Sequence, residues 1–129
     1  MNVYFIEDNP KFFQEVKKTI EGHLGWVRVI RWTTGDILDS ETHMDSSGLL
    51  FMDLDLPGQN SLGLFDDIRS KTDIPIVVID DVEFGAGRIM KALRLGASDY
   101  ILKPVHNSRL IATVLTHSMG EKYALSEVK

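Results

Sequence analysis

Short apolar, β-branched runs alternate along this chain with segments whose apolar residues recur at helical spacing. These runs predict strands and helices in alternation. Two of the runs are almost continuously apolar, which is typical of parallel strands covered on both faces. We therefore predict an α/β fold with strands at residues 3–6, 26–32, 49–52, 76–79 and 100–102, and helices around 12–24, 62–68, 89–93 and 110–115, with a weaker candidate over 36–44.

The length of 129 residues fits one domain with one core, which we place at residues 1–122, with 123–129 as a tail or the start of a linker. The absence of cysteine excludes disulfides, thiolate zinc sites and a cysteine nucleophile. A net charge of -5 argues against direct nucleic-acid contact by this domain. No apolar run approaches the length of a membrane span, so we expect a cytoplasmic protein.

Charged residues follow four of the five predicted strands. In a doubly wound parallel sheet the carboxyl ends of the strands form one crevice, where side chains from separate connections converge. We therefore expect six carboxylates and one ammonium group at this edge: Glu7 and Asp8, Asp53 and Asp55, Asp80 and Asp81, and Lys103.

Such a cluster needs compensating positive charge. Two unit charges about 4 Å apart repel by roughly 4 kcal/mol at an effective dielectric constant near 20. Carboxylate oxygens suit Mg²⁺, which binds through one or two of them and keeps waters that a phosphate can replace. Lys103 can hold a phosphoryl oxygen, and an aspartate beside the metal can attack phosphorus as a nucleophile.

Four segments in order, VYFIEDNP, LLFMDLDLPG, IPIVVIDD and GASDYILKP, resemble those of response-regulator receiver domains over nearly the whole chain. The resemblance implies a flavodoxin-like (βα)5 doubly wound sandwich, with a five-stranded parallel sheet of order 2-1-3-4-5 and helices on both faces. It also implies a histidine kinase or phosphotransfer protein as partner. An output domain or partner protein is expected on the face formed by the fourth helix, fifth strand and fifth helix.

The same resemblance implies a role for each site residue. Asp53 is the implied phosphoacceptor and Lys103 the phosphate-binding lysine. The bond before Pro104 is expected to be cis, and Tyr100 to be the switching aromatic. The implied magnesium ligands are Glu7, Asp8, Asp53 and the backbone carbonyl of Asp55.

The chain departs from the receiver pattern at the end of the fourth strand, where receivers carry serine or threonine. Counting from Pro75 puts Asp80 at that position, whereas counting back from Lys103 gives Asp81, and we prefer Asp80. A carboxylate about 4 Å from a phosphoryl group is repelled by several kcal/mol. We therefore expect phosphorylation of Asp53 to be weak or uncoupled from switching, with Asp80 pairing with Lys103 or enlarging the metal site.

Two other functions compete with a phosphorylated receiver. One is a pseudo-receiver, an interaction module that works without phosphorylation. The other is a phosphatase of the haloacid-dehalogenase type, with Asp53 as nucleophile and Asp55 as acid/base. Its motif has threonine or valine where this chain has Pro57, and its lysine precedes the acidic pair, whereas Lys103 follows it. We therefore predict that the chain is not an enzyme.

Overall fold

The computed structural model describes residues 1–33, 36, 46–58, 60–84 and 86–118. The candidate helix over 36–44 lies outside the described residues except for Asp36, and the predicted tail lies outside them entirely. The described elements are β1 (Asn2–Ile6), α1 (Pro10–His23), β2 (Arg28–Trp32), β3 (Leu49–Asp53), α3 (Ser61–Lys71), β4 (Ile76–Asp81), the 3₁₀ turn η1 (Val82–Phe84), α4 (Gly87–Arg94), β5 (Asp99–Lys103) and α5 (Asn107–Ser118).

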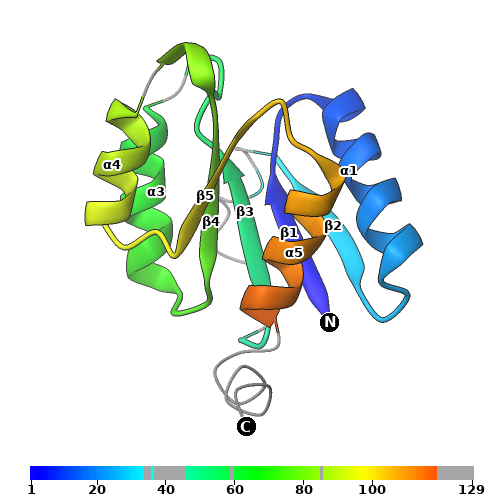
Figure 1. The fold of residues 1–129 in the computed structure, drawn as a ribbon. Coiled ribbons are helices and arrows are strands. Elements are labelled where there is room, and N and C mark those ends of the chain that lie inside the picture. The colour runs from blue at the N-terminus through cyan, green and yellow to red at the C-terminus, as the bar shows by residue number, and fades with distance from the viewer. Residues whose placement is uncertain (34–35, 37–45, 59, 85, 119–129) are drawn as a thin grey trace, which may run out of the picture.

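The five strands form one parallel sheet of order β2-β1-β3-β4-β5, which confirms the predicted fold. Helices α1 and α5 cover one face of the sheet, and α3 and α4 cover the other (Figure 1). The register aligns Asp53 of β3 with Ile79 of β4, and Asp81 of β4 with Lys103 of β5. The charged strand ends therefore lie at one edge of the sheet, as the sequence predicts.

Two apolar layers hold the helices to the sheet, because successive strand residues point to opposite faces. Phe51 and Ile101 belong to the layer under α1 and α5. Met52 and Val78 belong to the layer under α3 and α4. This alternation continues to the strand ends, where it decides which charged side chains can meet.

Asparagine side chains cap the starts of two helices. The Asn9 side chain accepts hydrogen bonds from the first turn of α1, and Pro10 occupies the first helical position. The cap of α3 is Asn60, whose side chain accepts the N–H of Gly63. The bond before Pro104 is cis, as predicted. None of the described helices is long and apolar enough to span a membrane.

Candidate functional site

Asp53 and Lys103 form a buried ion pair at the carboxyl edge of the sheet. Lys103 Nζ lies 2.5 Å from Asp53 Oδ2, and the Asp53 residue is only 2% exposed. The other carboxylate oxygen accepts the N–H of Asp55 at 2.8 Å. Burial opposes the charge on Lys103, but the hydrogen bond and the charge of Asp53 outweigh burial and raise the pKa of the ammonium group. Lys103 therefore stays positively charged.

Glu7 adds a second carboxyl group to this pair. It is 3% exposed, and burial, followed by a hydrogen bond and repulsion from Asp53, raises its pKa to about 8. Its Oε1 accepts the N–H of Asn9 at 2.9 Å, which fixes the side chain against the start of α1. Two buried carboxyl groups with one ammonium group leave one negative charge that a proton or a further cation must balance.

The backbone that carries Glu7 and Asp8 is held by Arg31 of β2. Arg31 Nε donates to the Glu7 carbonyl at 2.8 Å, and Nη2 donates to the Asp8 carbonyl at 3.1 Å. Sequence reasoning missed this residue, because its targets are backbone carbonyls, which carry no signature in the sequence. Arg31 fixes the loop in which the acidic pair lies and brings a positive charge close to it.

Asp80 does not pair with Lys103, which corrects the sequence-based expectation. Asp80 is 0% exposed, and its carboxylate accepts a bidentate pair of hydrogen bonds from Arg88 of α4, with Nε–Oδ2 at 2.8 Å and Nη2–Oδ1 at 2.5 Å. The Asp81 N–H donates to Oδ1 at 2.8 Å. The reason is the alternation of β4, which turns Asp80 toward α4 with Val78, whereas Lys103 and Asp53 continue the opposite face.

Asp55 and Asp81 lie nearer to solvent than their neighbours. The Asp55 residue is exposed, and only its backbone N–H contacts Asp53 among the hydrogen bonds of the described residues. Asp81 is half-buried and accepts the N–H of Glu83 at 3.1 Å. Asp80, and not Asp81, is therefore the buried acid near the end of β4.

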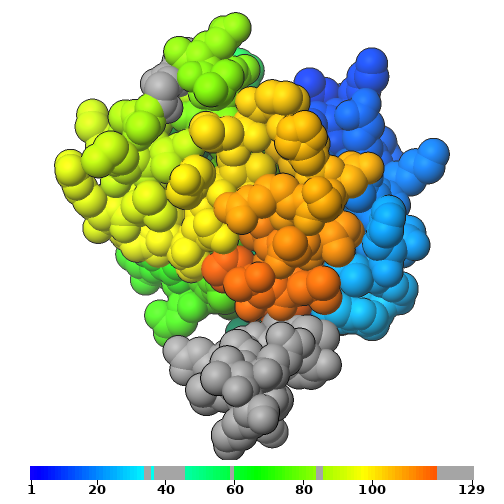
Figure 2. Space-filling model, viewed as in Figure 1, coloured from blue at the N-terminus to red at the C-terminus, as the bar shows by residue number. Residues whose placement is uncertain are grey.

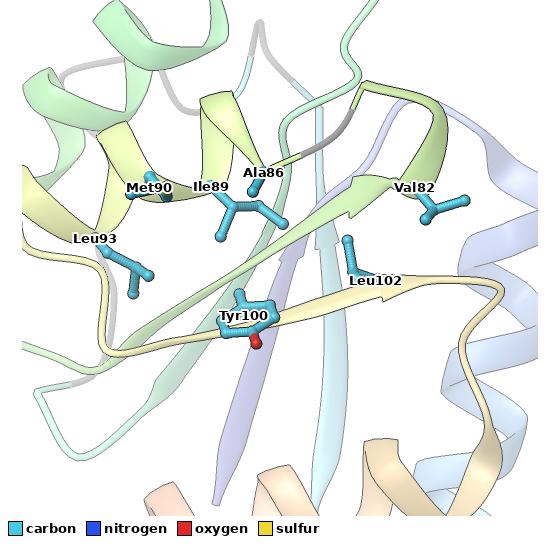
Figure 3. Close-up of a pocket in the computed structure, with 7 residues that line it drawn as sticks. All are labelled: Val82, Ala86, Ile89, Met90, Leu93, Tyr100 and Leu102. Carbon is cyan, nitrogen blue, oxygen red and sulfur yellow. The ribbon is translucent and has the colours of Figure 1, made fainter.

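Tyr100 lies outside the charged cluster, on the same face as Asp80. It is 41% exposed and borders an apolar pocket of about 370 Å³ between α4 and β5. Its ring faces the α4 side chains while its hydroxyl oxygen points away from them (Figure 3). The pocket is lined by Val82, Ala86, Ile89, Met90, Leu93, Tyr100 and Leu102.

The donor set fits a hard divalent cation. No three acidic or histidine side chains among the described residues converge as a complete metal site. Mg²⁺, however, needs only one or two carboxylates and completes its shell with water. The buried Glu7 and Asp53 carboxyl groups share an excess of negative charge, which such an ion would balance. These residues, with Asp8 next to Glu7 in the chain, are suitable ligands.

The comparisons with known proteins agree with this geometry. The family model described as the response regulator receiver domain matches residues 3–115. The transcriptional regulatory protein RstA of Escherichia coli is 29% identical over 117 residues, which are 89% of this chain and 47% of that protein. The response regulator protein GraR of Staphylococcus haemolyticus is 32% identical over 117 residues, 87% of this chain and 49% of that protein. The chain thus spans about half the length of these relatives.

Solved structures share the fold. Full-length FixJ from B. japonicum superposes with a TM-score of 0.80 at 21% identity, covering 98% of this chain and 62% of that one. A response regulator from Thermotoga maritima gives a TM-score of 0.73 at 24% identity, covering 92% of this chain and 98% of that one. With the match of the family model to residues 3–115, the chain belongs to the response-regulator receiver domain family of two-component signal transduction.

Proposed function

We propose that this receiver domain accepts a phosphoryl group on Asp53 from a histidine kinase or phosphotransfer protein. The observation that carries the proposal is the buried Asp53 carboxylate with Lys103 Nζ at 2.5 Å and Glu7 beside it. An Asp53 oxygen attacks phosphorus and forms a P–O bond, while the P–N bond to the donor histidine breaks and its electrons stay on the imidazole. Lys103 is placed to bind a phosphoryl oxygen as negative charge is brought to Asp53.

Magnesium is part of this proposal. Glu7, Asp8 and Asp53 would hold the ion with the Asp55 carbonyl, and when bound it neutralises charge on the phosphoryl oxygens. The chain's own residues prepare the site without it. Arg31 fixes the loop carrying the acidic pair, and the Asn9 N–H orients Glu7.

The pairing of Asp80 changes the expected effect of the acid at this position. The predicted repulsion of several kcal/mol treated its charge as uncompensated, whereas Arg88 neutralises it in a buried two-pronged contact. We propose that Asp53 still accepts the phosphoryl group, and that the domain is atypical in how it switches. Without a hydroxyl at position 80, a different group must report the modification.

The test is modification of the purified chain by acetyl phosphate with Mg²⁺, followed by intact mass. We expect one phosphoryl group per wild-type chain, none on Asp53→Asn, and none when EDTA removes the metal. Lack of modification on the wild-type chain would support the alternative, a phosphorylation-independent pseudo-receiver. One observation favours that alternative: both carboxylate oxygens of Asp80 already accept hydrogen bonds, from Arg88 and from the Asp81 N–H.

The phosphatase alternative has less support. Asp55 would have to act as acid/base, but the residue is exposed, and its hydrogen bond to Asp53 comes from the backbone N–H and not from the carboxylate. The relatives named above are a transcriptional regulatory protein and a response regulator, although the similar proteins include a protein-glutamate methylesterase from Treponema pallidum, of which the chain covers 33%. We expect no turnover of a generic phosphatase substrate.

The surface for an output domain or partner protein is proposed to be the face formed by α4, β5 and α5, which lie next to one another on one side of the molecule (Figure 2). Large apolar side chains are exposed there although the chain is acidic overall. Exposed apolar patches on soluble domains commonly mark interaction sites. The exposed apolar residues on α4 and β5 are Met90, Leu93, Tyr100 and Leu102.

A further inference from the structure

Arg88 joins the start of α4 to the end of β4. It is the second residue of the helix, and the helix N-cap, Ala86, makes no side-chain capping bond. The Arg88 side chain is 29% exposed, whereas the Asp80 side chain is 0% exposed. The buried acid thus fixes the position of a cation that solvent and a ligand can still reach.

Asp80 directly follows Ile79, the register partner of Asp53 on the neighbouring strand, so the Arg88–Asp80 pair lies at the same carboxyl edge of the sheet as the phosphoacceptor. The hydrogen bond to Asp80 is the main cause that raises the pKa of Arg88, and the charges of Asp55 and Asp53 raise it further. The guanidinium group is planar, and its Nε and Nη2 donate to Asp80. This group matches phosphoryl oxygens well, and it keeps its charge at every working pH.

We propose that Arg88, positioned by Asp80, senses the phosphoryl group on Asp53 in place of the missing hydroxyl, and that it draws the start of α4 toward the site. This inference rests on the proposed phosphorylation of Asp53. It explains why an acid is tolerated at the end of β4: the acid positions an arginine, and the arginine supplies the positive charge that a phosphoryl group attracts.

The same helix carries the signal to the surface. Ile89 and Met90 follow Arg88 directly and line the apolar pocket with Tyr100 and Leu102 (Figure 3). A displacement of the first turn of α4 therefore changes the pocket and the surroundings of Tyr100. Met90 is 49% exposed at this pocket, so its methyl group is a local reporter of the displacement.

The test compares variants that all lack the buried carboxylate. Asp80→Asn keeps Arg88, and the double variant Asp80→Asn/Arg88→Met removes it without leaving a buried charge uncompensated. Beryllofluoride with Mg²⁺ serves as the phosphoryl mimic, its affinity is measured by titration, and the Met90 methyl resonance is followed by NMR. We expect the double variant to bind about tenfold more weakly than Asp80→Asn, the size of one charge-assisted hydrogen bond.

The Met90 resonance gives the second readout. We expect it to shift on binding in the wild-type chain and in Asp80→Asn, and to stay in place in the double variant even at saturation. Asp80→Asn/Arg88→Lys keeps the positive charge but lacks the planar guanidinium group, so it should recover part of the affinity and part of the shift of the Met90 resonance. Asp80→Asn/Lys91→Met removes a different positive charge from the same helix, and we expect its affinity to stay within about twofold of Asp80→Asn because exposed charges are screened.

The outcomes separate this inference from the function on which it rests. If beryllofluoride binds all variants equally and moves Met90 in all of them, Arg88 is no sensor and the inference is wrong. The same holds if the Lys91 control loses as much affinity as the Arg88 variant, because net charge then explains the effect. If the mimic binds neither the wild-type chain nor any variant, phosphorylation of Asp53 itself is refuted and the inference falls with it.

Discussion

Two buried aspartates lie at the carboxyl ends of neighbouring strands and each pairs with a cation, but the two pairs are built differently. Asp53 meets the single ammonium of Lys103 through one oxygen, while Asp80 meets the guanidinium of Arg88 through both. Asp53 belongs to the face under α1 and α5, and Asp80 to the face under α3 and α4. The difference indicates which pair can open. The ammonium group of Lys103 can move from Asp53 to a phosphoryl oxygen, whereas the bidentate contact with Arg88 holds the Asp80 carboxylate in place.

The largest effect should come from breaking the Asp80 pair. Arg88→Met leaves a fully buried carboxylate without its cation, and we expect the free energy of unfolding to fall by about 3–5 kcal/mol. Urea denaturation followed by circular dichroism measures this loss. In Asp80→Asn/Arg88→Met no charge is left behind, so most of the stability should return. A double variant as unstable as Arg88→Met would show that packing of the arginine stem, and not the ion pair, stabilises this end of α4.

The asymmetry between the pairs also shows what the sequence could reveal. The meeting of Glu7, Asp53 and Lys103 was predictable, because the carboxyl ends of parallel strands share an edge and a lysine after the last strand must face it. The strand order followed from the resemblance, and the structure confirms it.

The partner of Asp80 was not predictable in the same way. It depends on which face β4 turns toward α4 and on where α4 begins after the turn, and neither is fixed by a motif. An alternating pattern in residues 76–81 would have indicated the face, but the run is apolar on both sides, as buried parallel strands are. Arg31 was missed for a different reason, since it binds backbone carbonyls.

The next effect in size concerns pH at the Asp53 pair. The folded pKa of Glu7, about 8, lies above its ordinary value of 4.5, so the fold binds this proton more tightly than the unfolded chain does. Its stabilising contribution is complete below pH 4.5 and is lost as pH rises through 8. We expect the metal-free chain to lose about 3 kcal/mol of unfolding free energy between pH 5 and 8.

Glu7→Gln is the matched variant for this pH dependence. The free energy of unfolding of this variant should not change between pH 5 and 8, and at pH 8 the variant should be more stable than the wild-type chain. Millimolar Mg²⁺ should stabilise the wild-type chain at pH 8 more than the variant, because only the wild-type chain has the excess carboxylate charge. If the stability of the wild-type chain does not depend on pH in this interval, burial and Asp53 do not raise the pKa of Glu7.

A smaller loss is expected when Lys103 is removed. Lys103→Met takes the cation from Asp53, but the Lys103 side chain is 25% exposed, so water can reach the site and Glu7 can keep its proton. We expect the unfolding free energy at pH 7 to fall by about 1–2 kcal/mol, measured by the same urea titrations. A loss equal to that of Arg88→Met would contradict the view that the two pairs differ in how firmly they are held.

The smallest effect concerns what holds Lys103 while its pair with Asp53 is open. The Lys103 ammonium nitrogen lies 4.8 Å from the centre of the ring of Phe12, which is in the first turn of α1. A cation over an aromatic face contributes about 0.5–1 kcal/mol at a partly exposed site. A double-mutant cycle of Phe12→Leu with Lys103→Met should therefore give a coupling of about 0.5 kcal/mol, separate from the packing lost in each single variant. Because the ring adds no charge, the coupling should persist when beryllofluoride draws the ammonium away from Asp53. Its disappearance on binding would mean that Lys103 leaves Phe12 as well, and that the lysine swings further than a local change of partner requires.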